Sequence, residues 1–234
     1  MGLRRWSGHA SIHSKPLSME ILRNYINTIR RDFANRPLDE ISTPENPYAL
    51  FERWFEEAVG AQVLDPYAMI IATADENAQP SSRVVYMRDI SENGLVFYTN
   101  YQSHKANDLS GNPKIGVLFF WGDLERQIRI EGTVEKVSAE VSDAYFASRP
   151  RESQIGAWAS DQSTEITSRE HLELRVKQFE EQFKNQTVPR PPHWGGFLIK
   201  PFSFEFWQGR PSRLHDRIVY AKLNDSWKRS RLAP

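Results

Sequence analysis

The sequence predicts a mainly β fold with peripheral helices, an α+β protein built on an antiparallel barrel. From residue 68 onward, short segments of strand character follow one another, separated by turn-forming residues instead of regularly spaced helices. A doubly wound parallel sheet requires a helix between successive strands, so this spacing disfavours that architecture. The 234 residues are 39% hydrophobic and 12% aromatic, which is enough for one substantial core.

The first 45 residues are expected to form an extension, partly mobile, ahead of a single domain over residues 46–234. Residues 1–16 have the character of an arm, apolar residues recur at helical spacing over 22–33, and residues 34–45 form a polar linker. A helix is expected to begin at Asn46-Pro47, because Asn caps free amides and Pro is tolerated in the first turn. Gly60 can end that helix.

The remaining elements follow from alternating or continuous apolar runs bounded by turn residues. Three further helices are expected over Ser103–Leu109, Ser138–Ser148 and Ser168–Lys184, the last with Leu172, Val176, Phe179 and Phe183 on its buried side. The expected strands are Ala68–Ala74, Ser81–Arg88, Leu95–Thr99, Lys114–Trp121, Glu125–Val137, Gly196–Lys200, Phe202–Gln208, Arg213–Tyr220 and Trp227–Leu232.

Composition excludes several classes of function. Lys and Arg number 30 and Asp and Glu number 30, so a globally electropositive nucleic-acid binder is not expected. The absence of cysteine rules out disulfides, thiolate metal sites and Cys nucleophiles. His9 and His13 have the spacing of metal ligands but lie in the arm, and no metal site is expected. No apolar run approaches the ~20 residues of a membrane helix and no signal peptide is visible, so a soluble cytoplasmic protein without membrane contact is the expectation.

The segment from Arg213 to Tyr220 is the most informative. On a strand, Arg213, His215 and Arg217 share one face, where they repel one another unless something anionic or π-rich lies opposite. Residues 210–231 contain seven Lys or Arg and two acids, a local charge of +5 in a chain with no formal net charge. The alternative interpretation is a solvated edge strand, whose charges prevent pairing with another sheet.

Weaker signals point to phosphate. Ser103-His104-Lys105 opens a helix whose N-terminal amides can bind a phosphate, and Tyr145, Arg149 and Ser153 recur around a helix end where they can hold a dianion. Each has an ordinary alternative as a helix cap, a core side chain or a solvated charge. No G-x-G-x-x-G or G-x-x-x-x-G-K-[ST] loop is present. Taken together, the signals indicate a protein that binds more than one phosphate without a P-loop.

The chain resembles the pyridoxamine 5′-phosphate oxidase family over about residues 46–234, with a looser match over 20–45. The resemblance is carried by ordered blocks: Leu50–Trp54, Phe97–Asn100, Leu124–Gln127, Ser148–Arg151, Ser153–Trp158, Gln162-Ser163, Trp194–Gly196, Glu205–Gly209, Arg213–Arg217 and Arg231–Pro234.

The resemblance implies a homodimer of FMN-binding split β-barrels with FMN at the subunit interface. It implies oxidation of pyridoxine or pyridoxamine 5′-phosphate to pyridoxal 5′-phosphate, with O2 as the oxidant and H2O2 as a product. A same-fold flavin oxidase of the phenazine type, or a module that only stores FMN or pyridoxal phosphate or binds haem, are the alternatives. Tyr145, Arg149 and Ser153 favour a phosphorylated substrate, and Arg213 with His215 counts against a storage module.

The resemblance also implies roles for individual residues. Arg213 and His215 are the expected catalytic pair, with orienting and electrostatic roles, and proton transfer by His215 is left open. The residues expected to bind FMN are Arg83, Val84, Val85, Tyr86, Met87, Arg88, Tyr98, Thr99, His104, Lys105, Gln127, Gln162, Ser163, Trp207 and Arg217. The residues expected to bind substrate are Arg30, Phe33, Arg88, Tyr145, Arg149, Ser153, Arg213 and His215.

Three positions depart from the family pattern. Arg88 replaces a Lys, so a planar fork stands in place of a point charge. His104 replaces an Arg, which weakens one expected phosphate contact and makes it pH-dependent. Phe33 replaces a Tyr and lacks its hydroxyl. These changes bear on affinity more than on the fold.

Overall fold

The computed structural model describes residues 23, 26–27, 33 and 37–234. The chain divides into residues 1–32 and 33–234, and the second unit holds the sheet and helices described below. Of the helix expected over 22–33, only Arg23, Ile26 and Asn27 are described, and all three are helical. The expected arm over 1–16 and the expected substrate residue Arg30 lie outside the described residues.

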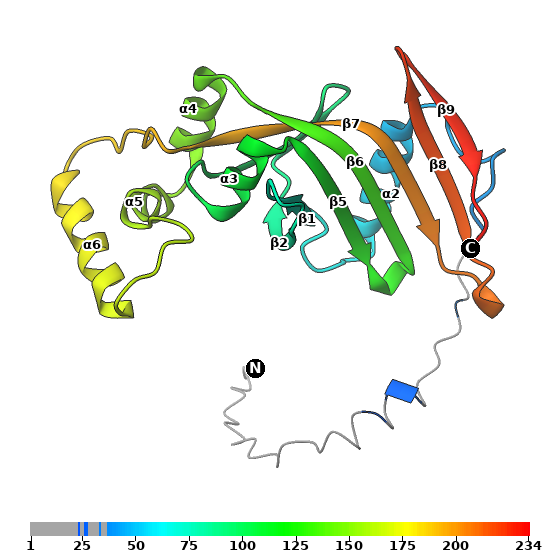
Figure 1. Cartoon of the computed structure of the whole chain (residues 1–234), viewed down its shortest axis with the longest axis horizontal. Helices are drawn as coiled ribbons and strands as arrows, with labels where there is room; N and C mark the ends of the chain where they lie inside the picture. Colours follow the sequence, from blue (N-terminus) through cyan, green and yellow to red (C-terminus); the bar gives the residue numbers. More distant parts are fainter. Residues whose placement is uncertain (1–22, 24–25, 28–32, 34–36) are drawn as a thin grey trace, which may run out of the picture. The chain divides into compact units, whose positions relative to one another are not determined.

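A nine-stranded antiparallel sheet forms the body of the second unit (Figure 1). Its order is β2-β1-β5-β6-β7-β4-β3, with β8 added to β7 and β9 added to β8. The strands are β1 (Ala68–Ala74), β2 (Pro80–Tyr86), β3 (Asp89–Ser91), β4 (Gly94–Asn100), β5 (Lys114–Trp121), β6 (Arg126–Lys136), β7 (Trp194–Gln208), β8 (Asp216–Leu223) and β9 (Ser226–Arg231).

Strand β7 organises this sheet. It is 15 residues long and pairs with β6 along one edge. Along its other edge, its first half pairs with β4 and its second half with β8. The two expected strands over 196–208 are therefore one strand. A register shift between Glu131 and Gly132 lets β6 follow it, and Gly132 is required there because a Cβ would lie 2.6 Å from the Lys200 carbonyl oxygen.

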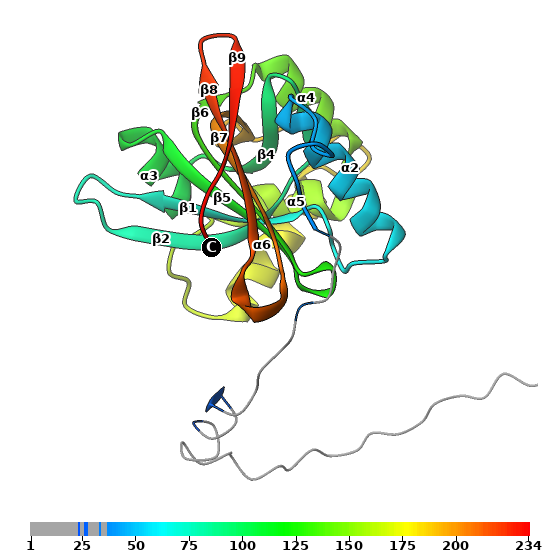
Figure 2. The ribbon, with the colours of Figure 1, turned by 90° about the vertical axis from the view of Figure 1, so that its right-hand side faces the viewer.

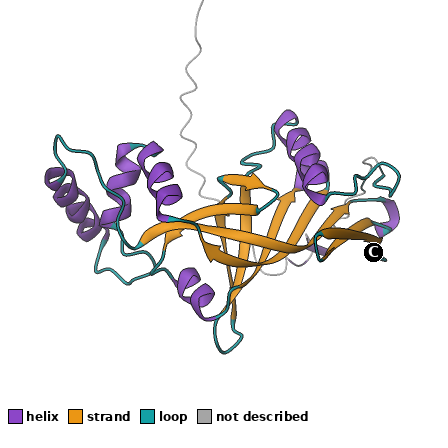
Figure 3. Ribbon diagram, turned by 90° about the horizontal axis from the view of Figure 1, so that it is seen from above, coloured by secondary structure: helices purple, strands orange, loops and turns teal. Residues whose placement is uncertain are grey.

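The helices lie around the margins of the sheet, which coils so that its strands cross at steep angles (Figures 2 and 3). The predicted mainly β architecture with peripheral helices is confirmed. Within the described ranges, no helix has both the length and the apolar character needed to cross a membrane. The helices are α2 (Pro47–Gly60), α3 (His104–Gly111), α4 (Ala139–Ser148), α5 (Arg151–Ala159) and α6 (Arg169–Gln182), with short 3-10 turns at Gly122–Leu124 and Pro211–Arg213.

In helix α2, the capping residue and the apolar face of the sequence match the observed packing. The Asn46 side chain accepts a hydrogen bond from the Tyr48 amide, as a capping residue does. Leu50, Phe51 and Trp54 are almost fully buried on the face toward the sheet, and the Trp54 ring meets Phe206 of β7 edge-on at 5.3 Å. The predicted helix start is confirmed.

Two predictions about local structure were wrong or incomplete. The strand expected over Arg213–Tyr220 begins only at Asp216, because Pro211 enters a turn in which Ser212 and Arg213 have positive φ angles of 55° and 60°. Asp216 pairs with Gln208, so residues 209–215 form the connection between β7 and β8. Helix α5 was not predicted, because Pro150 follows the end of α4 and Gly156 lies inside the new helix.

Candidate functional site

A hollow of about 350 Å³ opens where β2 and β4 meet α3 and the α4–α5 junction. Four of its described lining residues are cationic, and no described lining residue is Asp or Glu. Such a lining favours an anionic ligand. The residues are Arg83, Val84, Val85, Tyr86, Arg88, Tyr98, Thr99, Lys105, Tyr145, Arg149, Gln162 and Trp194.

Lys105 marks one end of the hollow. Its ammonium donates to the side-chain oxygens of Gln162 at 2.6 Å, and of Thr99 and Ser103 at 3.3 Å each. All three acceptors are uncharged. Burial, reinforced by the neighbouring Arg83, lowers the pKa of Lys105 to about 8. A buried ammonium beside a guanidinium, with only neutral acceptors, is suited to receive a phosphate.

Arg149 marks the other end. Tyr98 and Tyr145 stack at 3.8 Å between ring centroids, and Trp194 extends the stack beside Tyr98 at 5.4 Å. The Arg149 guanidinium lies 4.6 Å from the centre of the Trp194 ring. Its Nη1 is buried without a hydrogen-bond acceptor among the described residues, and burial lowers its pKa. A buried donor of this kind requires a partner, which an anionic ligand supplies.

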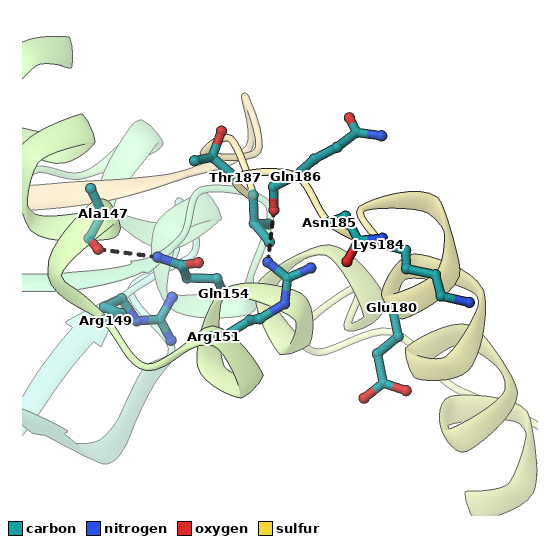
Figure 4. A pocket seen from close by; sticks show the side chains of 10 residues that line it. Ala147, Arg149, Arg151, Gln154, Glu180, Lys184, Asn185, Gln186 and Thr187 are labelled. Carbon is teal, nitrogen blue, oxygen red and sulfur yellow. Dashed lines mark hydrogen bonds between the residues drawn. The ribbon is translucent and has the colours of Figure 1, made fainter.

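Arg149 also lines a second, larger hollow of about 840 Å³ (Figure 4). Its polar side chains hold the surrounding segments together. Arg151 donates to the carbonyl oxygens of Phe183 and Gln186, and Gln154 donates to that of Ala147. The Gln154 contact fixes the junction between α4 and α5, which carries Arg149, and the Arg151 contacts hold the start of α5 against the segment that follows α6.

Not every expected residue reaches the first hollow. Met87 is buried, whereas His104 and Ser163 are exposed. Ser153 lies in the first turn of α5. None of these four is among the lining residues. Because Tyr145 belongs to α4 and Ser153 to α5, the expected trio does not follow a single helix.

A second group of expected residues lies on β6, β7 and β8. In the sheet register Gln127 is opposite Trp207, and Trp207 is opposite Arg217. The Arg217 Nε donates to the buried Glu205 carboxylate at 2.8 Å, and this hydrogen bond raises the Arg217 pKa. The three side chains are therefore cross-strand neighbours, and Glu205 orients one of them.

His215 joins this second group from the β7–β8 connection. Its ring lies 4.6 Å from Trp207, and Phe33 meets it edge-on at 5.3 Å. The Arg210 amide donates to His215 Nδ1 at 3.1 Å, so the neutral ring carries its proton on Nε2. Burial and the adjacent Arg213 lower the His215 pKa, which favours that neutral form.

The two groups lie at opposite ends of β7. Trp194, its first residue, lines the hollow, whereas Trp207 near its other end contacts His215. The two are 13 positions apart, which at ~3.3 Å per residue is roughly 40 Å along the strand. In one chain, the residues around Lys105 and Arg149 are therefore brought together, but Arg213 and His215 are not brought to them.

Some residues of the hollow were not predicted as site residues. Trp194 stands in a block that resembles the family, but no role was expected for it. Thr73, Ser81 and Asp108, which contact Arg83 but do not line the hollow, were also missed. The strand pairing that places Thr73 opposite Ser81 is the signal that reveals two of them.

Comparisons with known proteins agree on the family. A family model described as pyridoxamine 5′-phosphate oxidase matches residues 55–183, and one described as a pyridoxine 5′-phosphate oxidase C-terminal dimerisation region matches residues 194–234. A pyridoxine/pyridoxamine 5′-phosphate oxidase of Trichormus variabilis is 51% identical over 207 residues, covering 88% of this chain and 97% of the relative. Another, of Chromohalobacter salexigens, is 52% identical over 214 residues, covering 90% and 100%.

Solved structures show the same fold. PhzG from Burkholderia lata, in complex with tetrahydrophenazine-1-carboxylic acid, superposes with a TM-score of 0.80 at 29% identity, covering 86% of this chain and 99% of the other. A pyridoxamine 5′-phosphate oxidase-related, FMN-binding protein of Nostoc punctiforme gives 0.65 at 15% identity, covering 82% and 100%, a likeness of fold alone. The predicted split β-barrel is thus confirmed, and the chain belongs to the pyridoxine/pyridoxamine 5′-phosphate oxidase family, with FMN as its cofactor.

Proposed function

We propose that this protein oxidises pyridoxine 5′-phosphate or pyridoxamine 5′-phosphate to pyridoxal 5′-phosphate. FMN would supply the two-electron redox chemistry, with O2 as the final acceptor that leaves as H2O2, and the amine substrate would also consume water and release ammonia. The observation that carries this proposal is the hollow with two separate cationic ends, at Lys105 and at Arg149, and no described acidic lining residue. Two such ends suit two phosphorylated molecules, the cofactor and the substrate.

We assign the FMN phosphate to the Lys105 end. Lys105 and Arg83 supply the charge, and Thr99 and Gln162 already contact the ammonium. Val84, Val85 and Tyr86 of β2, Arg88 just after it, and Tyr98 of β4 would flank the flavin. Met87, Ser163 and the exposed His104 are retained as expected neighbours of the cofactor, although they do not line the hollow.

We assign the substrate phosphate to the Arg149 end. The unsatisfied Arg149 Nη1, the Tyr145 hydroxyl and Arg88 together offer the donors that a dianion needs. Ser153 and Arg30 remain proposed contributors. The stack of Tyr98, Tyr145 and Trp194 holds these groups rigid, which fixes the position of the substrate.

We further propose that Arg213 and His215 act on the substrate held by a second copy of this chain, in a homodimer with FMN at the interface. The wide separation of the two groups along β7 requires another chain to complete the site, and the C-terminal match to a dimerisation region supports it. The outward faces of β2 and β5 expose Val84 and Phe120, to 62% and 63%. Such exposed apolar side chains are suited to burial against that copy.

In this arrangement Arg213 orients the substrate and stabilises developing charge, and His215 donates a hydrogen bond to the substrate from Nε2. Its Nδ1 is occupied by the Arg210 amide, so proton acceptance at that atom is blocked. Gln127, Trp207 and Arg217 would contact the flavin from the same side, with Glu205 holding Arg217 in place. Phe33 would shield the imidazole from water.

The low pKa of Lys105 predicts a pH dependence of FMN affinity. A bound phosphate dianion stabilises the ammonium, so above pH 8 the protein must take up a proton to bind FMN. The FMN dissociation constant is expected to rise about tenfold between pH 7 and pH 9, while that of riboflavin stays constant. Flavin fluorescence titrations across this range measure both. Lys105→Arg, which keeps its charge throughout, should remove the slope, and a slope retained in that variant would contradict the assignment.

The activity itself is tested by incubating the holoprotein with pyridoxine 5′-phosphate and O2 and measuring H2O2 and pyridoxal 5′-phosphate. Equimolar products are expected, and unphosphorylated pyridoxine should react far more slowly. Flavin that stays bound while neither vitamin B6 phosphate is turned over would contradict the proposal.

The likeness to PhzG supports a second candidate, a flavin oxidase acting on an unphosphorylated tricyclic acid. Arg149→Met separates the two candidates. It should abolish oxidation of the phosphorylated substrate, whereas turnover of a dihydrophenazine carboxylic acid that survives the substitution would favour the second.

A further inference from the structure

A buried carboxylate and two hydroxyl groups lie directly behind Arg83. Thr73 on β1 and Ser81 on β2 are opposite each other in the sheet register, and Asp108 reaches them from α3. The Asp108 side chain is only 4% exposed. A carboxylate this deeply buried requires hydrogen-bond donors, and the two hydroxyl groups provide them.

The Thr73 and Ser81 oxygens lie 3.4 Å apart, but the Asp108 carboxylate is the nearer acceptor for both hydroxyl protons. A carboxylate only accepts, so both hydroxyl protons point at Asp108 Oδ2, from Thr73 at 2.5 Å and from Ser81 at 3.2 Å. Each hydroxyl oxygen then has lone pairs left for a donor. Arg83 supplies the donors: its Nη1 lies 2.8 Å from the Thr73 oxygen, and its Nη2 lies 2.6 Å from the Ser81 oxygen.

The carboxylate therefore acts on the guanidinium mainly through the hydroxyl groups. Its direct approach to Arg83 Nη2 is 3.7 Å, longer than either hydroxyl contact. A bidentate Arg–Asp pair would occupy the guanidinium and compete with a phosphate. The described contacts engage only the two terminal nitrogens, which leaves the Nε–H of Arg83 available. His104 approaches the other carboxylate oxygen, Oδ1, at 3.4 Å, and so lies outside this relay.

We propose that Asp108 is a positioning residue for the cofactor phosphate, acting through the hydroxyl groups of Thr73 and Ser81 to fix the guanidinium of Arg83. The proposal rests on the assignment of the FMN phosphate to Arg83 and Lys105. Its consequence is selectivity: the relay strengthens binding of the phosphorylated flavin and contributes nothing to the flavin ring.

Thr73→Val tests the relay, because valine keeps the shape and removes both hydrogen bonds. FMN-loaded and riboflavin-loaded protein are diluted, and flavin release is followed by fluorescence. The FMN dissociation constant should rise about tenfold and that of riboflavin should not change. Thr133→Val, an exposed threonine of β6, is the matched control and should alter neither. Equal weakening of both flavins would show that Thr73 only supports the fold, and would overturn the proposal.

A double-mutant cycle tests whether the effect of Thr73→Val on FMN affinity originates at Asp108. Asp108→Asn removes a negative charge near the phosphate as well as the acceptor, so its own effect combines two opposing changes. Its coupling to Thr73→Val is decisive: the threonine substitution should have little further effect in the Asp108→Asn background, whereas additive effects would overturn the relay. If Asp108→Asn does not fold, Ser81→Ala removes the other arm of the relay, and it too should weaken FMN binding and leave riboflavin binding unchanged; equal weakening of both flavins would overturn the relay. A wild-type protein that binds FMN and riboflavin equally would instead refute the phosphate assignment itself.

Discussion

Replacing Arg213 with leucine is expected to lower kcat/KM for pyridoxine 5′-phosphate about a thousandfold and to leave FMN affinity unchanged. Removing a charged group that acts on the reacting atoms has an effect of this size. Arg213 is exposed, has positive φ, and forms no hydrogen bond or ion pair with the described residues of its own chain. This is the state expected of a side chain whose partner is a substrate held elsewhere.

Steady-state kinetics and a flavin titration on the same preparation measure the two quantities. Arg169→Leu provides the control, because Arg169 is an exposed arginine of α6 with a single ion pair to Glu173. It should behave as wild type. A loss of FMN affinity that parallels the loss of turnover would place Arg213 at the cofactor instead of the substrate.

Mixing two inactive variants is expected to restore activity. If each site combines Lys105 of one copy with Arg213 of the other, a heterodimer of Lys105→Met and Arg213→Leu chains contains one site with both wild-type groups. Random pairing makes half of the dimers heterodimers, so coexpression should recover about a quarter of wild-type activity. Each variant alone is expected to be nearly inactive, so the activity of the mixture should exceed that of either variant by a large factor.

The matched control uses two substitutions on the same half of the site. Lys105→Met with Arg149→Met leaves every site of the heterodimer with one defect, so no recovery is expected. Peroxide production by the coexpressed mixture is the measurement, and heterodimers purified from it through two different tags should reach about half of wild-type activity. Failure of the first mixture to recover activity would show that Lys105 and Arg213 of one chain serve the same site, or that no shared site exists.

The fold could be predicted from sequence where pattern and packing agree. β1 and β5 have the bounds that their apolar runs predicted, and α2 begins at the predicted cap. The strand predicted to begin at Arg213 was wrong there, because charged residues that alternate in sequence also occur in a tight connection between strands. Only the pairing of Gln208 with Asp216 reveals where the strand begins.

The candidate site was harder to predict, because its geometry comes from contacts far apart in sequence. Lys105 and Gln162 are 57 positions apart and meet at 2.6 Å. The Tyr98–Tyr145 stack joins a strand to a helix. Family resemblance supplied the names of most of these residues, but not the hydroxyl relay from Asp108, which follows from the register of β1 and β2.

The continuity of β7 sets a rule for how such a chain can change length. Side chains along a strand alternate between faces, so one residue inserted between Trp194 and Trp207 would invert every position beyond it, turning Glu205 and its neighbours toward the opposite surface. An insertion in a loop, such as residues 160–168 between α5 and α6, leaves both ends of β7 unchanged. The length of β7 is therefore more constrained than the lengths of the loops that connect the elements around it.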